Sequence, residues 1–317
     1  MKPGFSFNDA IGAPFVLLRR RPLYLFVWGL IMMALVAAMY SLLIPAMGSM
    51  IGAADRQEAF DIYMLEAVRL QAALNGMNLV MYLIMLLTWT AAARATLSPG
   101  RGDRFLFLRL GMDEVRVAVT VVAVFVAWYI ALLVLILIGV GIIAALWSSS
   151  EATAIVVLVL YGLLVLALSI WGWLRVSLIA PASLILKRFA FVEGWALARG
   201  QMWKLFGLNL VVWLIYMVSL ILMYALAGAI LVGSFFGQGL EWPAQVEGYA
   251  DVQPLVQAMI VPALATLIPF SIVFGWIMAL YAAPGVVAAR QLLDGVPTPP
   301  VGPIVEDAPP IDTLQSS

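Results

Sequence analysis

The sequence predicts an all-α integral membrane protein with six transmembrane helices, and three observations support this fold class. Of its 317 residues, 65% are hydrophobic and only 11% are charged, whereas a soluble domain carries about 25% charged residues. Its apolar residues form six runs, each as long as the roughly 20 residues that a helix needs to cross a bilayer. Its basic residues lie almost entirely in alternate gaps between these runs, a pattern typical of multi-pass membrane proteins.

The six apolar runs define the predicted transmembrane helices. They cover about residues 23–47, 74–97, 115–147, 152–186, 205–236 and 255–289. The last four exceed the length needed to cross the membrane, which predicts tilt, kinks or helical extension beyond it. Pro262 and Pro269 lie inside the sixth run, and a kink is expected there because each proline removes a backbone donor. The first run is too long for the apolar core of a signal peptide and is interpreted as a retained helix.

The distribution of Lys and Arg predicts the orientation of the bundle. Fifteen of the seventeen basic residues lie before the first run, after the sixth, or in the gaps between the second and third and the fourth and fifth runs together with the run ends that flank these gaps. Arg56 and Arg69 are the two that lie in the opposite gaps. Because loops rich in Lys and Arg stay in the cytoplasm, both termini are predicted to be cytoplasmic.

A basic and aromatic stretch precedes each odd-numbered run, which predicts an internal threefold repeat. We expect residues 1–295 to form a single transmembrane domain of three tandem units, at about residues 1–97, 98–186 and 187–295. Each unit would consist of an interfacial helix and a transmembrane hairpin, and the units would be parallel, related about an axis along the membrane normal. The recurring segments are Arg104-Phe105-Leu106-Phe107 with Arg188-Phe189-Ala190-Phe191, and Gly172-Trp173 and Pro181 with Gly275-Trp276 and Pro284.

Residues 296–317 differ sharply from the rest of the chain. They are rich in Pro and contain three acidic residues and no basic one. This composition predicts a disordered cytoplasmic tail.

The basic residues of the interfacial stretches are candidate contacts for the lipid bilayer. Basic and aromatic side chains together are typical of a helix at the headgroup layer, and each basic residue can contribute about 1 kcal/mol to binding anionic phospholipids. The alternative is that these residues only set topology, because the positive-inside rule accounts for all of them. The candidates are Arg19, Arg20, Arg21, Arg104, Arg109, Lys187, Arg188, Arg199 and Lys204.

Two of these segments resemble a known family. They are Leu18-Arg19-Arg20-Arg21-Pro22-Leu23 and the block from Arg175 to Leu205, including Trp195-x-Leu197-x-Arg199-Gly200-x-x-Trp203-Lys204. They are similar to a bacterial polytopic superfamily that comprises the membrane domain of some glycerophosphodiester phosphodiesterases and small, largely uncharacterised inner-membrane proteins. The resemblance is clearest over residues 170–215, and it implies a multi-pass helical module of the bacterial cytoplasmic (inner) membrane. It implies no activity, because the chemistry of the fused relatives resides in a separate soluble domain.

The chain lacks the residues on which most enzyme chemistry depends. It contains no Cys and no His, so thiolate nucleophiles, imidazole bases and His-ligated metals are excluded. The middles of the six runs carry no Asp, Glu, Lys or Arg, which disfavours proton-coupled transport. The net charge of zero gives no support to nucleic-acid binding. We therefore expect no catalytic site, no cofactor and no metal.

Two functions remain open. The first is a non-enzymatic structural or accessory component that acts through lipid or protein contacts. The second is an uncoupled transporter or lipid-translocating protein with a path between the repeats, for which Asn75, Asn78 and Asn209 form a candidate polar pocket. The same asparagines can instead make ordinary interhelical hydrogen bonds. A polar cavity near them would favour transport, and a tightly packed centre would favour the accessory role.

Overall fold

The computed structural model describes residues 4–54, 60–98, 106–109, 111–147, 150–239 and 249–295. Within these ranges every regular element is a helix, and six segments are long and apolar enough to cross a membrane. The predicted class, an all-helical protein with six candidate membrane spans, is confirmed to this extent. In chain order the helices are α1 (Phe7–Arg20), α2 (Pro22–Ala54), α3 (Phe60–Leu97), α4 (Met112–Trp147), α5 (Glu151–Val176), α6 (Ile179–Leu186), α7 (Phe191–Leu197), α8 (Met202–Gly237) and α9 (Tyr249–Asp294).

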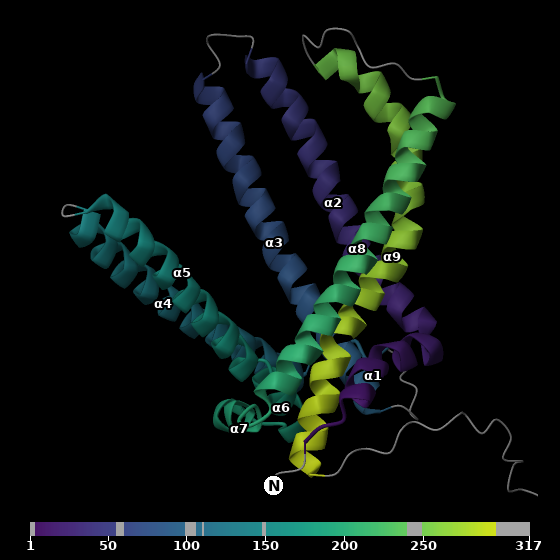
Figure 1. Ribbon diagram of the computed structural model, residues 1–317. Helices are drawn as coiled ribbons and strands as arrows, with labels where there is room; N and C mark the ends of the chain where they lie inside the picture. Colours follow the sequence, from purple (N-terminus) through teal and green to yellow (C-terminus); the bar gives the residue numbers. More distant parts are fainter. Residues whose placement is uncertain are drawn as a thin grey trace, which may run out of the picture.

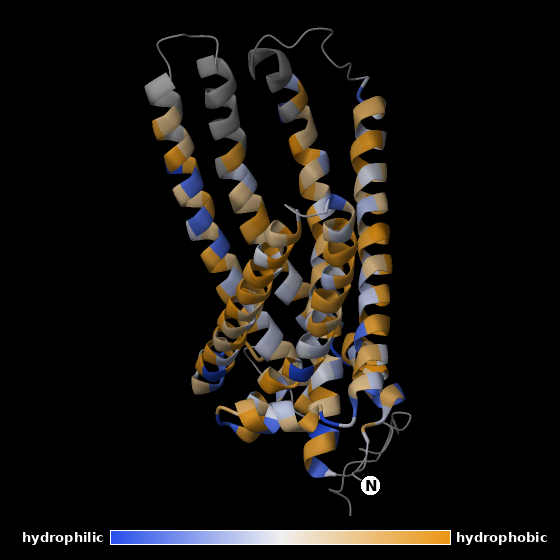
Figure 2. Cartoon of the chain, turned by 60° about the vertical axis from the view of Figure 1, so that its left-hand side comes forward, coloured by the Kyte–Doolittle hydropathy of each residue, from blue (hydrophilic) through white to orange (hydrophobic). Residues whose placement is uncertain are grey.

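The long helices form three hairpins that diverge from a shared base (Figure 1). The pairs are α2 with α3, α4 with α5, and α8 with α9. The short helices α1, α6 and α7 lie at the base, and both ends of the described chain are there too. Hydrophobic residues cover most of the three hairpins, while hydrophilic residues lie mainly toward the base and along part of α3 (Figure 2). A chain that crosses the membrane an even number of times has both ends on the same side, as the two ends at the base are here.

Helix α9 is central to the bundle because it contacts α1, α2, α3 and α8. Its closest partner is α2, and glycine makes the approach possible. A Cβ at Gly29 of α2 would collide with the backbone carbonyl of Ser271, and one at Gly275 of α9 would collide with that of Leu25. The two backbones are therefore in direct contact, as small residues permit between membrane helices.

The buried core lies in the lower part of the bundle. Trp28 of α2 is completely buried, and its indole N–H donates to the carbonyl oxygen of Leu106 at 3.1 Å. Small side chains of α3 and α9 surround it, which lets these helices approach closely. The hairpins are therefore held together near the base. The buried alanines are Ala91, Ala92, Ala93 and Ala95 of α3 and Ala279, Ala282 and Ala283 of α9.

The structure divides the fourth predicted run, which the sequence analysis treated as one helix. Helix α5 ends at Val176 and α6 begins at Ile179. Pro181 explains the division, because its ring would clash with the carbonyl group of Ser177 in a continuous helix, whereas proline is tolerated in the first turn of a new one. The prolines of α9 act differently. That helix continues through Pro262 and Pro269 and changes direction near its upper end (Figure 1).

The predicted interfacial helices are found in part. Helices α1 and α7 occupy the positions expected ahead of the first and third hairpins. Ahead of the second hairpin, the described residues 106–109 form a turn instead, in which Leu106 and Phe107 have φ values of 55° and 61°. Left-handed backbone of this kind does not occur within an α-helix. The prediction of a helix is therefore wrong for these four residues.

Candidate functional site

The α4–α5 hairpin stands apart from the other two. Its helices pack on each other and reach the rest of the bundle through α3, α6, α7 and α8, and Figure 1 shows their outer parts diverging from the bundle. Two glycines set the packing between them. The ring of Tyr161 lies directly on Gly139, and the ring of Trp128 lies directly on Gly172. The Tyr161 hydroxyl also donates to the carbonyl oxygen of Leu135 at 2.5 Å.

Both helices of this hairpin expose large apolar side chains along their length. An apolar surface this extensive needs hydrocarbon or another membrane protein against it. Examples near the middle of the helices are Phe125, Val126, Tyr129, Ile130, Val159, Leu160, Leu163 and Leu164, each at least 48% exposed.

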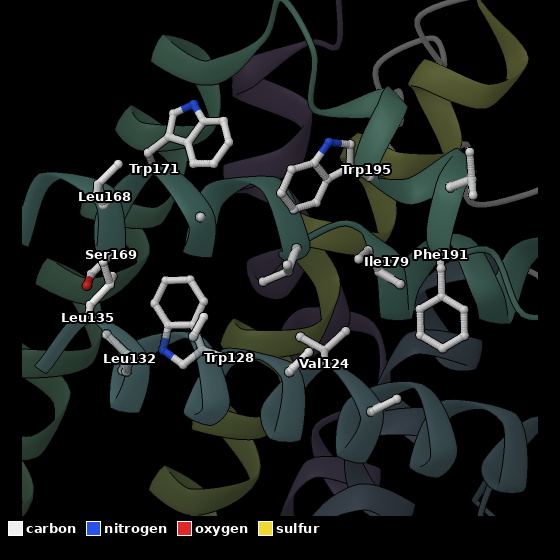
Figure 3. A pocket seen from close by; sticks show the side chains of 16 residues that line it. Val124, Trp128, Leu132, Leu135, Leu168, Ser169, Trp171, Ile179, Phe191 and Trp195 are labelled. Atoms are coloured by element: carbon white, nitrogen blue, oxygen red, sulfur yellow. The ribbon is translucent and has the colours of Figure 1, made fainter. Parts of the chain in front are cut away.

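A groove of about 810 Å³ follows the lower part of the hairpin and ends against α6 and α7. Ala123, Ala127 and Ala131 line it from α4, and their four-residue spacing places them on one face of the helix. Figure 3 shows Trp128 of α4 on one side of the groove and Trp171 and Trp195 on the other. Apart from Ser169 and the indole N–H groups, the lining side chains are apolar. The groove is therefore suited to an apolar ligand.

The short helices at the base are fixed in place beside the groove. Gly194 of α7 lies directly against the backbone of Ile179, where a Cβ would collide. The buried Ser183 hydroxyl accepts a hydrogen bond from the Ala190 amide at 3.0 Å and lies 3.5 Å from the Thr120 hydroxyl of α4. These contacts join α4, α6 and α7, so they determine where Trp195 meets the groove.

Arg175 does not line the groove itself but lies one helical turn after Trp171, against two tryptophans that do. Its guanidinium carbon is 5.4 Å from the ring centroid of Trp171 and 5.7 Å from that of Trp195. The two rings are edge to face, with centroids 5.7 Å apart. Contacts of a cation with aromatic faces contribute about 0.5–2 kcal/mol each. The two indoles therefore hold the guanidinium in one position.

Two nitrogens of Arg175 are unsatisfied. Its Nε and Nη1 atoms are buried and have no hydrogen-bond partner in the described part of the chain. Buried polar atoms normally have a partner, and one without it calls for an explanation such as an absent ligand. Glu193 is the single acidic residue between Arg175 and Lys204, a stretch with five basic residues. Its carboxylate pairs with Arg188 at 2.8 Å.

The basic residues predicted to contact lipid lie in elements at the base, apart from Arg104, which is outside the described residues. Arg21 turns inward: it donates to the Ser98 carbonyl oxygen at 2.8 Å and lies over the Phe107 ring. Arg188 pairs with Glu193. The candidates with exposed side chains are Arg19, Arg20, Arg109, Lys187, Arg188, Arg199 and Lys204.

The structure places the three asparagines of the candidate polar pocket on two helices. Asn75 and Asn78 are exposed on α3, and the Asn75 side chain accepts a hydrogen bond from Gln71 at 3.2 Å. Asn209 donates to the Leu205 carbonyl oxygen at 2.8 Å, within its own helix α8. No hydrogen bond recorded for the described residues joins α3 to α8 through these side chains, and the pocket stays a prediction.

A buried ionic network that the sequence analysis did not identify joins α3 to α4. The Glu114 carboxylate is 4% exposed and pairs with the Arg94 guanidinium. Asp113 lies 3.5 Å from the same guanidinium and 2.7 Å from that of Arg116. Glu114 also accepts a hydrogen bond from the Gly111 amide at 2.8 Å, the contact that a glutamate at the third helical position makes in a capping box. The position of Glu114 at the third residue of α4 was the feature of the sequence from which its contact with Gly111 could have been predicted.

Chemically, the hairpin offers a place for an apolar chain beside a fixed positive charge. Within the described ranges, no three acidic side chains gather as a metal site would require. Comparison of the chain with protein-family models, with curated proteins and with solved structures finds no match in any of the three.

Proposed function

We propose that this protein is a non-catalytic, multi-pass component of a bacterial inner membrane that acts through lateral contacts with lipid or with another membrane protein. The exposed α4–α5 hairpin is the observation that carries the proposal. A hairpin that served only to complete the bundle would bury one side against the other helices. This one instead presents apolar side chains on nearly all sides, so most of its surface is free for lateral contacts.

The proposal includes an orientation in which the base faces the cytoplasm. The basic residues at the base support it, because Lys and Arg are enriched in cytoplasmic loops. Three hairpins that start from the same base also support the organisation into three tandem units (Figure 1). The proposal also retains the expected resemblance of residues 170–215 to the bacterial superfamily, and this segment includes α6 and α7.

The first experiment tests lateral contact. A photo-reactive amino acid replaces Val126 of α4 or Leu163 of α5, with Ile221 of α8 as the matched control, since all three are exposed near the middle of long helices. After illumination of native membranes, we expect a higher yield of distinct lipid or protein adducts from the two hairpin positions. Equal yields at all three positions would contradict the proposal.

The second experiment separates the proposal from the lipid-translocating alternative. The purified protein is reconstituted into vesicles that carry a fluorescent phospholipid in both leaflets, and dithionite is added outside. A non-translocating component leaves the inner-leaflet fluorescence protected, as in protein-free vesicles. Loss of that protected fraction would establish translocation and overturn the accessory role.

A further inference from the structure

We infer that the groove between α4, α5, α6 and α7 binds an anionic phospholipid, with one acyl chain along Ala123, Ala127 and Ala131 and the phosphate at Arg175. This inference rests on the proposed function, because both place the α4–α5 hairpin in lipid with its base at a headgroup layer. The inference adds to the proposed function a defined binding site and the requirement that the lipid headgroup be anionic. Arg175 is not among the basic residues that the sequence marked as lipid contacts.

The length of the groove fits the acyl region of one leaflet. Its lining on α4 extends from Ala123 to Leu135, about 18 Å at the helical rise of 1.5 Å per residue. Half of a hydrocarbon core roughly 30 Å thick is comparable in length. A transmembrane helix from another protein would need a surface that continues across the whole bilayer. The extent of the groove therefore favours a lipid chain over a helix.

The chemistry of the lining also fits an acyl chain. The alanines of α4 and Gly172 of α5 are small and leave space in the groove. The rings of Trp128, Trp171 and Trp195 border this space (Figure 3). Tryptophan favours the boundary between hydrocarbon and headgroups, because its ring is apolar and its N–H is polar. An acyl chain in the groove would thus have its polar end near Trp195, beside Arg175.

Charge complementarity identifies the headgroup as anionic. Arg175 is partly exposed, but its Nε and Nη1 atoms are buried without partners, and a buried polar atom without a partner is unfavourable. The only nearby acidic residue in sequence, Glu193, is engaged by Arg188. Phosphate oxygens are strong acceptors for a guanidinium. A headgroup with net negative charge would also compensate Lys187 and the other basic residues of this stretch, which a zwitterionic headgroup does less well.

The test measures lipid retention by native mass spectrometry of the full-length protein, delipidated and then titrated with phosphatidylglycerol or phosphatidylcholine. Arg175→Gln removes the charge, and Arg69→Gln makes the same change at an exposed site of α3 outside the groove. Ala127→Leu fills the groove, and Ala167→Leu adds the same volume to an exposed position of α5 that does not line it. Each variant must elute from size-exclusion chromatography as the unmodified protein does.

We expect one tightly held phosphatidylglycerol, bound at least tenfold more weakly after either Arg175→Gln or Ala127→Leu and within twofold of the original after either control. Phosphatidylcholine should bind the unmodified protein at least fivefold more weakly. Equal effects of Arg175→Gln and Arg69→Gln would overturn the phosphate site. Unchanged retention in Ala127→Leu would overturn the acyl site, and a second copy or another protein in place of lipid would overturn both.

The two proposals fail separately. If α4–α5 gives the enriched adducts but Arg175→Gln and Ala127→Leu retain phosphatidylglycerol as the controls do, the lipid site is wrong and the lateral function stands. If vesicles lose protected fluorescence while these variants show the expected weakening, the site stands and the accessory function is wrong.

Discussion

At the scale of single residues, a charged side chain at the base of the bundle needs a partner of opposite charge because little water reaches it. Arg94 and Glu114 form such a pair, and Glu114 also holds the first turn of α4 through the Gly111 amide. Removing one partner of a buried pair leaves an uncompensated charge and is far more costly than replacing both by apolar groups. The pair therefore ties the first turn of α4 to the end of α3.

Glu114→Ala should destabilise the protein by about 3–5 kcal/mol because it leaves the Arg94 guanidinium buried without its main partner. The measurement is thermal or denaturant unfolding in detergent. Glu151→Ala, at an exposed position near the start of α5, is the control and should change stability by less than about 1 kcal/mol. The double variant Arg94→Met with Glu114→Leu should lose less stability than Glu114→Ala alone. An equal loss of stability would show that the unpaired charge of Arg94 is not the cause.

At the scale of single residues, the sequence predicted which basic residues lie at the base better than it predicted what each of them contacts. The basic and aromatic stretches identified nine basic residues as candidate lipid contacts, and those that the structure describes lie in elements at the base. It did not distinguish Arg21, which turns inward, from Arg19 and Arg20. It gave no reason to select Arg175 either. The surroundings of that guanidinium include Trp195, twenty residues later on another helix, and such a contact depends on the tertiary fold.

At the scale of helices, the crossing of α2 and α9 shows that packing between helices depends on more than the apolar character of each run. All six runs are apolar, so hydropathy alone does not predict which helices become neighbours. The first and last long helices meet because Gly29 and Gly275 remove the side chains at the point of contact. Pro181 similarly divides an apolar run that has no change in composition. Both effects depend on single residues within uniform sequence.

Gly29→Ala should therefore destabilise the bundle by about 1–3 kcal/mol, the usual cost of overpacking, because the new methyl group meets the Ser271 carbonyl. Gly76→Ala is the matched control, since nothing lies within 4 Å of a Cβ at that position of α3. It should be neutral, or stabilising by up to about 1 kcal/mol through helix propensity. Unfolding in detergent measures both, and equal stability of the two variants would contradict the close crossing.

For the whole molecule, the buried core lies at one end and the hairpins diverge from it. The core clusters around Trp28 and Leu178 draw on α1, α2, α3, α4, α5, α6, α8 and α9 in their lower parts. The groove runs along the diverging α4–α5 hairpin, and Arg175 lies against two of its lining residues, Trp171 and Trp195. Composition and charge predicted the six spans, but the separation of one hairpin from the others follows from tertiary contacts at the base.

The orientation of the molecule can be tested directly because the chain contains no cysteine. Single cysteines replace Ala152 and Gln238 at the outer ends of two hairpins, and Phe189 and Trp203 at the base; all four positions are exposed, and none of the changes alters a charge. With the base in the cytoplasm, a membrane-impermeant maleimide added to spheroplasts should label the first two positions, and the other two only after permeabilisation. The opposite pattern would reverse the bundle. It would also move Arg175 and its proposed phospholipid into the outer leaflet, so the same labelling determines which leaflet supplies the lipid.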